Sequence, residues 1–138
     1  MKLTCSVTTP ERLVHETGAR FVVVPAIDGE LGILPRHAPL TALLGTGELR
    51  VQGEGGEKES IFVRGGFVQV VANSINVLAT EAERADEIDR EAAQRDLEAA
   101  RAESRVGLSS DQLAEQRERI RAANVRARIA TGSGDAED

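Results

Sequence analysis

The segment that decides the fold is Phe67-Val68-Gln69-Val70-Val71-Ala72-Asn73-Ser74-Ile75-Asn76-Val77-Leu78. Two runs of β-branched and aromatic residues flank the turn sequence Ala72-Asn73-Ser74, and this arrangement predicts a β-hairpin. Each run has the ordinary length of a strand and is too short for a helix. The segment therefore indicates antiparallel strands in this part of the chain.

The same pattern of short apolar runs and turn residues fills the chain before this segment. The runs are residues 3–7, 13–14, 20–24, 33–34, 49–52 and 60–64. Pro10, Pro35 and the glycines at 53, 55 and 56 separate them, and we expect Gly65-Gly66 to break the chain between two strands. Strands repeated at this spacing predict an all-β antiparallel sandwich or barrel.

The composition changes near residue 80. Residues 1–80 contain 27 Val, Ile, Leu and Phe, whereas residues 81–138 contain 8 of these together with 13 Ala. The second part consists largely of Ala, Glu and Arg, which are strong helix formers. The chain is therefore expected to hold a sandwich over residues 1–85, an antiparallel helical hairpin over 86–131 and a disordered acidic tail over 132–138.

The helix limits follow from capping signals. Thr80 with Glu83 has the spacing of a capping box, and Asp86 and Asp89 are alternative N-caps. The first helix is expected to run from about residue 86 to Val106, with Gly107 at the C′ position. Ser109 with Gln112 predicts a capping box at the start of the second helix, which runs to about Thr131.

The second helix has two apolar stripes on opposite sides at 100° per residue. Leu113, Ile120, Ala123, Ala127 and Ala130 form one stripe, and Ala122, Val125 and Ile129 form the other. Two basic seams lie between them, Arg117/Arg121/Arg128 and Arg119/Arg126. An ordinary solvated helix with scattered alanines also fits this pattern. The alternative is a helix that packs within the hairpin on one face and meets an acidic surface with the other.

The composition argues against several classes of protein. No apolar run has the ~20 residues of a membrane-spanning helix, and the start lacks a signal or transit peptide. A net charge of −6 without Trp or Tyr argues against nucleic-acid binding. We expect a soluble, cytosolic chain in which Cys5 is a buried thiol.

No catalytic or metal-binding pattern stands out. The sequence has no phosphate-binding P-loop, and no pair among Cys5, His15 and His37 has ligand spacing. No Ser/His/Asp set can be assembled, and the carboxylates of residues 81–103 alternate with arginines as on a solvated helix face. We therefore expect no catalytic residues, no metal and no cofactor.

The segment Val24-Pro25-Ala26-Ile27-Asp28-Gly29-Glu30-Leu31-Gly32-Ile33-Leu34-Pro35-Arg36-His37-Ala38-Pro39-Leu40 is more particular. It resembles the signature segment of the epsilon subunit of F-type ATP synthases. The resemblance extends over residues 3–130 and includes Gly65-Gly66-Phe67-Val68-Gln69-Val70 and Asn76-Val77-Leu78-Ala79. It implies a sandwich of about ten strands followed by a helical hairpin.

The resemblance further implies a non-catalytic subunit of the rotor stalk. Its partners would be the gamma subunit, the ring of c subunits, and the alpha/beta catalytic subunits through the hairpin. It would couple proton-driven ring rotation to ATP synthesis, peripheral to the cytoplasmic face of a bacterial plasma membrane. The hairpin would fold down on the sandwich or extend to the catalytic ring and block ATP hydrolysis.

The family resemblance assigns roles to particular residues. The turn containing Asp28, Gly29, Glu30 and Leu31, with the nearby Arg36 and His37, would face the c ring; the family usually has Gly in place of Arg36. The inhibitory contact would come from Arg117, Arg119, Arg121, Arg126 and Arg128.

A nucleotide motif of the family is degenerate in this sequence. Some bacterial members bind ATP through Ile-Asp-x-x-Arg-Ala, and the matching residues are Ile88, Asp89, Ala92 and Ala93. Ala92 replaces the arginine, which removes a bidentate phosphate partner, so we expect weak or no ATP binding. The resemblance also favours a helix start at residues 86–89 over Thr80.

Two other functions remain as alternatives from the residues alone. A stand-alone nucleotide-sensing sandwich is disfavoured because the arginine is missing, and a structural adaptor because the hairpin lacks sustained a/d heptads. A gamma-type partner that co-purifies would distinguish the rotor subunit from a sensor that purifies alone.

Overall fold

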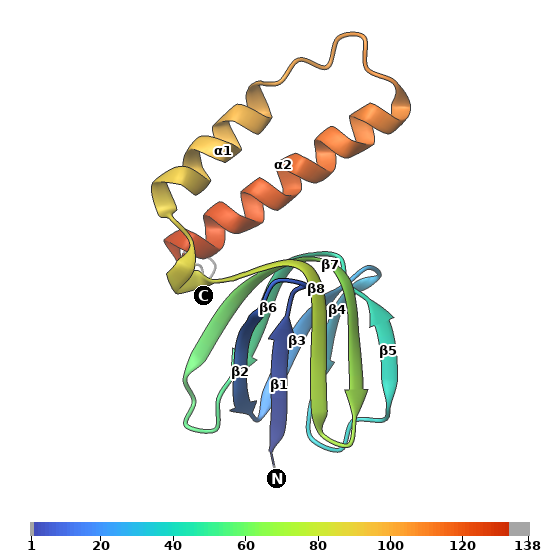
Figure 1. Cartoon of the computed structure of the whole chain (residues 1–138), viewed down its shortest axis with the longest axis vertical. Coiled ribbons are helices and arrows are strands. Elements are labelled where there is room, and N and C mark those ends of the chain that lie inside the picture. Colours follow the sequence, from blue (N-terminus) through green and yellow to red (C-terminus); the bar gives the residue numbers. More distant parts are fainter. Residues whose placement is uncertain (1, 133–138) are drawn as a thin grey trace. The chain divides into compact units, whose positions relative to one another are not determined.

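The computed structural model describes residues 2–132, which divide after Ala85 into two compact units. The first unit is built of strands and the second of two helices (Figure 1). No helix among the described residues is long and apolar enough to cross a membrane.

The first unit contains eight strands in one sheet, ordered β2-β1-β8-β7-β6-β3-β4, with β5 paired to β7. Their bounds are β1 Leu3–Thr8, β2 Leu13–Ala19, β3 Phe21–Ala26, β4 Gly29–Ile33, β5 Leu40–Leu43, β6 Thr46–Gln52, β7 Lys58–Val71 and β8 Ser74–Arg84. The sandwich class is confirmed, with eight strands rather than about ten. One pairing departs from the antiparallel expectation, because β1 runs parallel to β8.

The long strand β7 belongs to both halves of the sandwich. Its first half pairs with β6, its second half pairs with β5, and β8 follows it from Ile61 to Val71. The expectation that Gly65-Gly66 would break the chain is wrong, because β7 continues through both glycines and bends there. Gly66 has a φ of +103°, and a Cβ at this position would overlap the carbonyl oxygen of Leu78. Only glycine fits this close approach.

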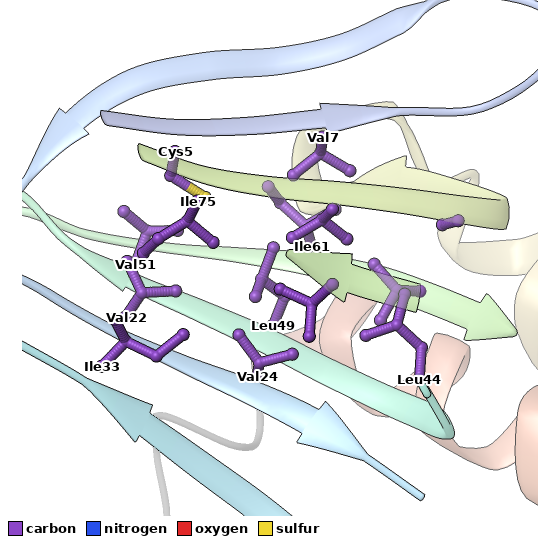
Figure 2. Close-up of a cluster of buried hydrophobic side chains, with 14 of the residues drawn as sticks. Cys5, Val7, Val22, Val24, Ile33, Leu44, Leu49, Val51, Ile61 and Ile75 are labelled. Carbon is purple, nitrogen blue, oxygen red and sulfur yellow. The ribbon is translucent and has the colours of Figure 1, made fainter. Parts of the chain in front are cut away.

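The core lies between the two halves of the folded sheet. Cys5, Val7 and Ile75 come from β1 and β8, and their side chains point toward Val22 and Leu49 of β3 and β6 (Figure 2). All five are fully buried. The alternation of buried and exposed residues along β1 and β6 arises because successive side chains in a strand point to opposite faces.

The first helix of the second unit, α1, spans Arg90–Ala102, after a short 3₁₀ turn at Ala85–Glu87. Asp89 is its N-cap and accepts a hydrogen bond from the Ala92 backbone N–H at 3.1 Å. The capping box at Thr80 is wrong because Thr80 lies in β8, which continues to Arg84.

The end of α1 also differs from the prediction. The helix stops at Ala102 rather than Val106, and Glu103 is already extended, with ψ at 137°. The Ser104 hydroxyl accepts a hydrogen bond from the Val106 N–H, which offers the backbone a turn in place of another helical bond. Gly107 has a φ of +80° but belongs to the connection and does not cap α1.

The second helix, α2, spans Ser110–Thr131 as predicted. Its capping box is confirmed, since the Ser109 side chain accepts from the Gln112 N–H and the Gln112 side chain accepts from the Ser109 N–H. Gly132, with a φ of +72°, ends the helix. The tail predicted for residues 132–138 lies outside the described residues beyond Gly132.

A substitution at the bend of β7 tests its importance. We expect Gly66→Ala to lower the free energy of unfolding by more than about 3 kcal/mol, because it adds a backbone clash to the roughly 1–3 kcal/mol of an unfavourable φ. Gly56→Ala is the matched control, since Gly56 also has a positive φ, +91°, but faces open space. Urea unfolding of the full chain measures both. Equal losses for the two variants would contradict a steric role for Gly66.

Candidate functional site

The arginines of α2 form two sets that differ in their contacts. Arg119 Nη2 lies 2.8 Å from Glu103 Oε1, and Arg126 Nη1 lies 3.3 Å from Asp96 Oδ2. The hydrogen bond to Glu103 raises the pKa of Arg119 further above its ordinary value. One of the two seams predicted from the sequence, Arg119/Arg126, therefore lies against the carboxylates of α1.

The second seam consists of Arg117, Arg121 and Arg128 and is more exposed at its first two members. Arg117 and Arg121 are exposed, and within residues 2–132 neither makes an ion pair or a side-chain hydrogen bond. Arg128, the third member, is half-buried. The five arginines assigned to one inhibitory contact are thus not equivalent in the structure.

The apolar face of the hairpin is shallow. Ala93, Leu97 and Ala100 are the buried residues of α1, so one large side chain contributes. The buried residues of α2 come from both predicted stripes, with Ala127 on the first and Ala122, Val125 and Ile129 on the second. The sequence prediction missed Gln116, which lies among the residues of the first stripe and is 1% exposed.

The turn between β3 and β4 is an exposed apolar tip. Ala26 pairs with Gly29, Gly29 has a φ of +131°, and Ile27 is 64% exposed at the tip. Asp28 is also exposed. The residue set predicted for the c ring left out Ile27, although its place between Ala26 and Asp28 in a tight turn is a signal for exposure.

Two other residues of that predicted set, Glu30 and Leu31, make contacts within the sandwich. Glu30 accepts two hydrogen bonds from the Arg50 guanidinium, at 2.9 and 3.0 Å, which is the bidentate geometry typical of this pair. Leu31 is partly buried and packs against the core. Residues 27–30 are all exposed, and of these Glu30 is bound to Arg50.

The segment containing Arg36 and His37 does not lie beside this turn, and the expectation that both share one end of the sandwich is wrong. Ala26 pairs with Gly29 at one end of β4 and Val22 pairs with Ile33 at the other. At about 3.3 Å per residue the two ends of β4 are about 13 Å apart. Arg36 has a φ of +69°, and its N–H donates to Asn73 Oδ1 at 2.7 Å, which joins this segment to the β7–β8 turn.

A row of exposed apolar side chains crosses the outer face of the sandwich, which the sequence analysis did not predict. Leu43 of β5 pairs with Phe67 of β7, Phe67 with Leu78 of β8, Leu78 with Thr8 of β1, and Thr8 with Leu13 of β2. We call these five residues the apolar row. Its four large members are between 40% and 60% exposed. The adjacent row, which includes Gln69 and Asn76, is polar.

A groove of about 330 Å³ lies along the apolar row. Its lining includes Thr8, Pro10, Gly66, Phe67 and Leu78. The groove is apolar and open, and it suits an aliphatic or aromatic side chain from another chain.

The residues of the degenerate nucleotide motif lie at the start of α1. Ile88 is 8% exposed, Asp89 is the N-cap, and Ala93 is 1% exposed. Ala92 is half-buried and carries no polar side chain. An anion at this site could therefore meet the backbone N–H groups of a helix N-terminus, but no guanidinium group.

Cys5, His15 and His37 do not form a common site. Cys5 is fully buried, and burial raises the pKa of its thiol to about 12, with a smaller contribution from Glu59. His15 Nε2 lies 3.2 Å from Glu59 Oε1, and His37 Nδ1 lies 2.7 Å from the Ala38 carbonyl oxygen. Among residues 2–132 no three His, Cys, Asp or Glu side chains are arranged to hold a metal ion.

Residues 2–85 match the family model described as ATP synthase, Delta/Epsilon chain, beta-sandwich domain. The ATP synthase epsilon chain of Carboxydothermus hydrogenoformans is 51% identical over 100 residues, which cover 72% of this chain and 74% of the relative. That of Syntrophomonas wolfei is 40% identical over 123 residues, 89% of this chain and 88% of the relative. The chain belongs to the ATP synthase epsilon chain family. This confirms the resemblance, and with it the expectation of a non-catalytic rotor-stalk subunit.

Solved structures agree on the fold. A chain in a cryo-EM structure of the Euglena gracilis mitochondrial ATP synthase (OSCP/F1/c-ring) superimposes with a TM-score of 0.77 at 22% identity, covering 96% of this chain and 81% of that one. A chain in the central stalk/c-ring structure from Tetrahymena thermophila gives 0.60 at 15% identity, covering 94% and 97%. At these identities the likeness concerns the fold.

Proposed function

We propose that this chain couples rotation of the c ring to ATP synthesis from within the central stalk, and that its hairpin inhibits ATP hydrolysis. Membership of the epsilon chain family is the observation that carries the proposal. In this role it binds the gamma subunit and the c ring through the sandwich and the alpha/beta subunits through the hairpin. It lies peripheral to the membrane, on the cytoplasmic face in a bacterium.

The apolar row is the surface we assign to gamma. Four large apolar side chains exposed in one row across the sheet are typical of a surface that is covered by a partner. The groove beside Phe67 and Leu78 would take a side chain of gamma, in the manner of an interface anchor. Under this assignment, gamma covers the exposed apolar row of the sandwich.

The c-ring contact is assigned to residues 27–29. Asp28 and Gly29 belong to the set expected from the family resemblance, and Ile27 adds an exposed apolar side chain at the tip. Glu30 supports the turn through Arg50, and Leu31 anchors it to the core. Arg36 and His37 follow the other end of β4, where the Arg36 N–H binds Asn73 of the β7–β8 turn.

Two polar substitutions test the gamma surface. We expect Phe67→Gln with Leu78→Gln to weaken binding of gamma by about tenfold or more, because truncating central apolar anchors typically costs above 1 kcal/mol. Glutamine is tolerated on this face, since Gln69 already stands in the neighbouring row. Isothermal titration with purified gamma measures the effect.

Val71→Gln is the matched control for this experiment. Val71 is 47% exposed on the same strand and the same face, beyond the polar row. We expect gamma to bind this variant as it binds the original chain. Equal weakening by the control and the double variant, or none by either, would count against the apolar row as the contact.

The inhibitory role is assigned to α2, because Arg117 and Arg121 present exposed guanidinium groups that suit an acidic surface. Deleting residues 86–138 is expected to raise ATP hydrolysis by the assembled enzyme severalfold. Arg117→Ala with Arg121→Ala is expected to relieve inhibition in the same direction while leaving the α1–α2 ion pairs intact. Hydrolysis unchanged by the deletion would refute inhibition, with the coupling role still standing.

ATP is not proposed as a ligand of the hairpin. Asp89 is engaged as the N-cap of α1, and Ala92 offers no group to a phosphate. We expect isothermal titration of the full chain with ATP to give no binding at micromolar concentrations. Ala92→Arg, which restores the guanidinium, is the comparison variant. A micromolar dissociation constant for the original chain would overturn this expectation.

A further inference from the structure

The two ion pairs between the helices share one register. Asp96 of α1 and Glu103, the C-cap residue directly after the helix, are seven residues apart, and their partners Arg119 and Arg126 are seven apart on α2. Seven residues are close to two turns of a helix, so Arg119 and Arg126 lie on one side of α2, where Glu103 and Asp96 bind them. The antiparallel arrangement brings both pairs to the same flank of the hairpin. We call these four residues the ionic flank.

The start of the connection between the helices, at Glu103, is bound by two side chains of α2. Gln116 Nε2 donates to the Glu103 carbonyl oxygen at 3.1 Å, while Arg119 binds the Glu103 carboxylate. Gln116 Oε1 is buried and has no hydrogen-bond partner among the described residues. A buried amide with half its capacity unmet stabilises the closed hairpin less than apolar packing would. The ionic flank therefore adds to the few contacts that hold α2 against α1 and the connection.

The ionic flank has a consequence for any acidic partner of α2. A carboxylate of the partner that binds Arg119 or Arg126 must replace Glu103 or Asp96. Exchanging one carboxylate for another at an exposed guanidinium gives little net free energy, and a ligand shifts an equilibrium only by its difference in affinity for the two states. Arg117 and Arg121, which have no such partner to exchange, can bind without this opposition.

We propose that Asp96 and Glu103 act as internal competitors of the acidic partner surface, an inference that rests on the proposed inhibitory function. While the hairpin is closed, they occupy Arg119 and Arg126, whereas Arg117 and Arg121 are available to the partner. Separation of α2 from α1 releases the other two arginines and strengthens the inhibitory contact. The carboxylates of α1 thus set how readily the hairpin passes from the closed state to the inhibitory state.

The test replaces these two carboxylates by amides of nearly the same size, which removes their charge. The variant is Asp96→Asn with Glu103→Gln. The matched control is Glu91→Gln with Glu98→Gln, which removes the same charge from the same helix at the same seven-residue spacing. Glu91 and Glu98 are exposed and make no ion pair with any residue in the described part of the chain.

The first measurement is the separation of the helices in the full chain. Spin labels at Gln94 and Asn124, both exposed, report it by electron–electron double resonance in a Cys5→Ala background. We expect the competitor variant to populate longer distances at low salt, and the control to match the original chain. High salt should lengthen the distances in the original chain and in the control but not in the competitor variant, because exposed ion pairs are screened. Equal distance distributions for the two double variants would overturn the proposal.

The second measurement is ATP hydrolysis by the assembled enzyme. We expect the competitor variant to lower it about two- to tenfold below the control, in keeping with the loss of two exposed ion pairs. Distances that change while hydrolysis stays equal to the control would overturn the competition. Deletion of residues 86–138 separates this outcome from failure of the inhibitory function itself, because that deletion raises hydrolysis whenever the hairpin inhibits.

Discussion

The close passage of the β7 backbone at Gly66 over the carbonyl of Leu78 is the constraint on which the sandwich depends. β7 pairs with β6 before this point and with β5 after it, while β8 follows both halves. The bend lets one continuous strand take part in both layers, and it closes the core between them. The same bend shapes the groove beside Phe67 and Leu78. The position that makes the fold possible therefore also forms the surface assigned to gamma.

The signals that predicted the fold are local ones. The hairpin at residues 67–78 and the capping box at Ser109 each depend on neighbours within a few residues, so the sequence contains all the information needed for them. The end of α1 was predicted four residues too late because apolar spacing and Gly107 outweighed the small local preference of Ser104. Helix formers continue past Ala102, and a single hydroxyl decides between a further helical bond and a turn.

The functional surfaces depend on contacts between distant segments, which the sequence does not encode locally. The apolar row needs the register of five strands at once, since a shift of one residue would turn Phe67 or Leu78 to the other face. The separation of Asp28 from Arg36 could have been predicted from the length of β4, because a strand between two turns places them at opposite ends. The division of the arginines required the pairing of α1 with α2, whereas helical periodicity could only sort them into seams.

The two units are stabilised by different kinds of interaction, and this difference suits their proposed roles. The sandwich buries fully closed layers of Val, Ile and Leu, whose contribution depends on apolar area and is little affected by salt. The hairpin buries mainly alanine on α1, so screened ion pairs on its flank have a larger part in its closure. A rotor subunit must transmit torque through a part that does not yield. A regulatory element must change state for a small free energy, and a shallow apolar face with exchangeable arginine partners provides that property.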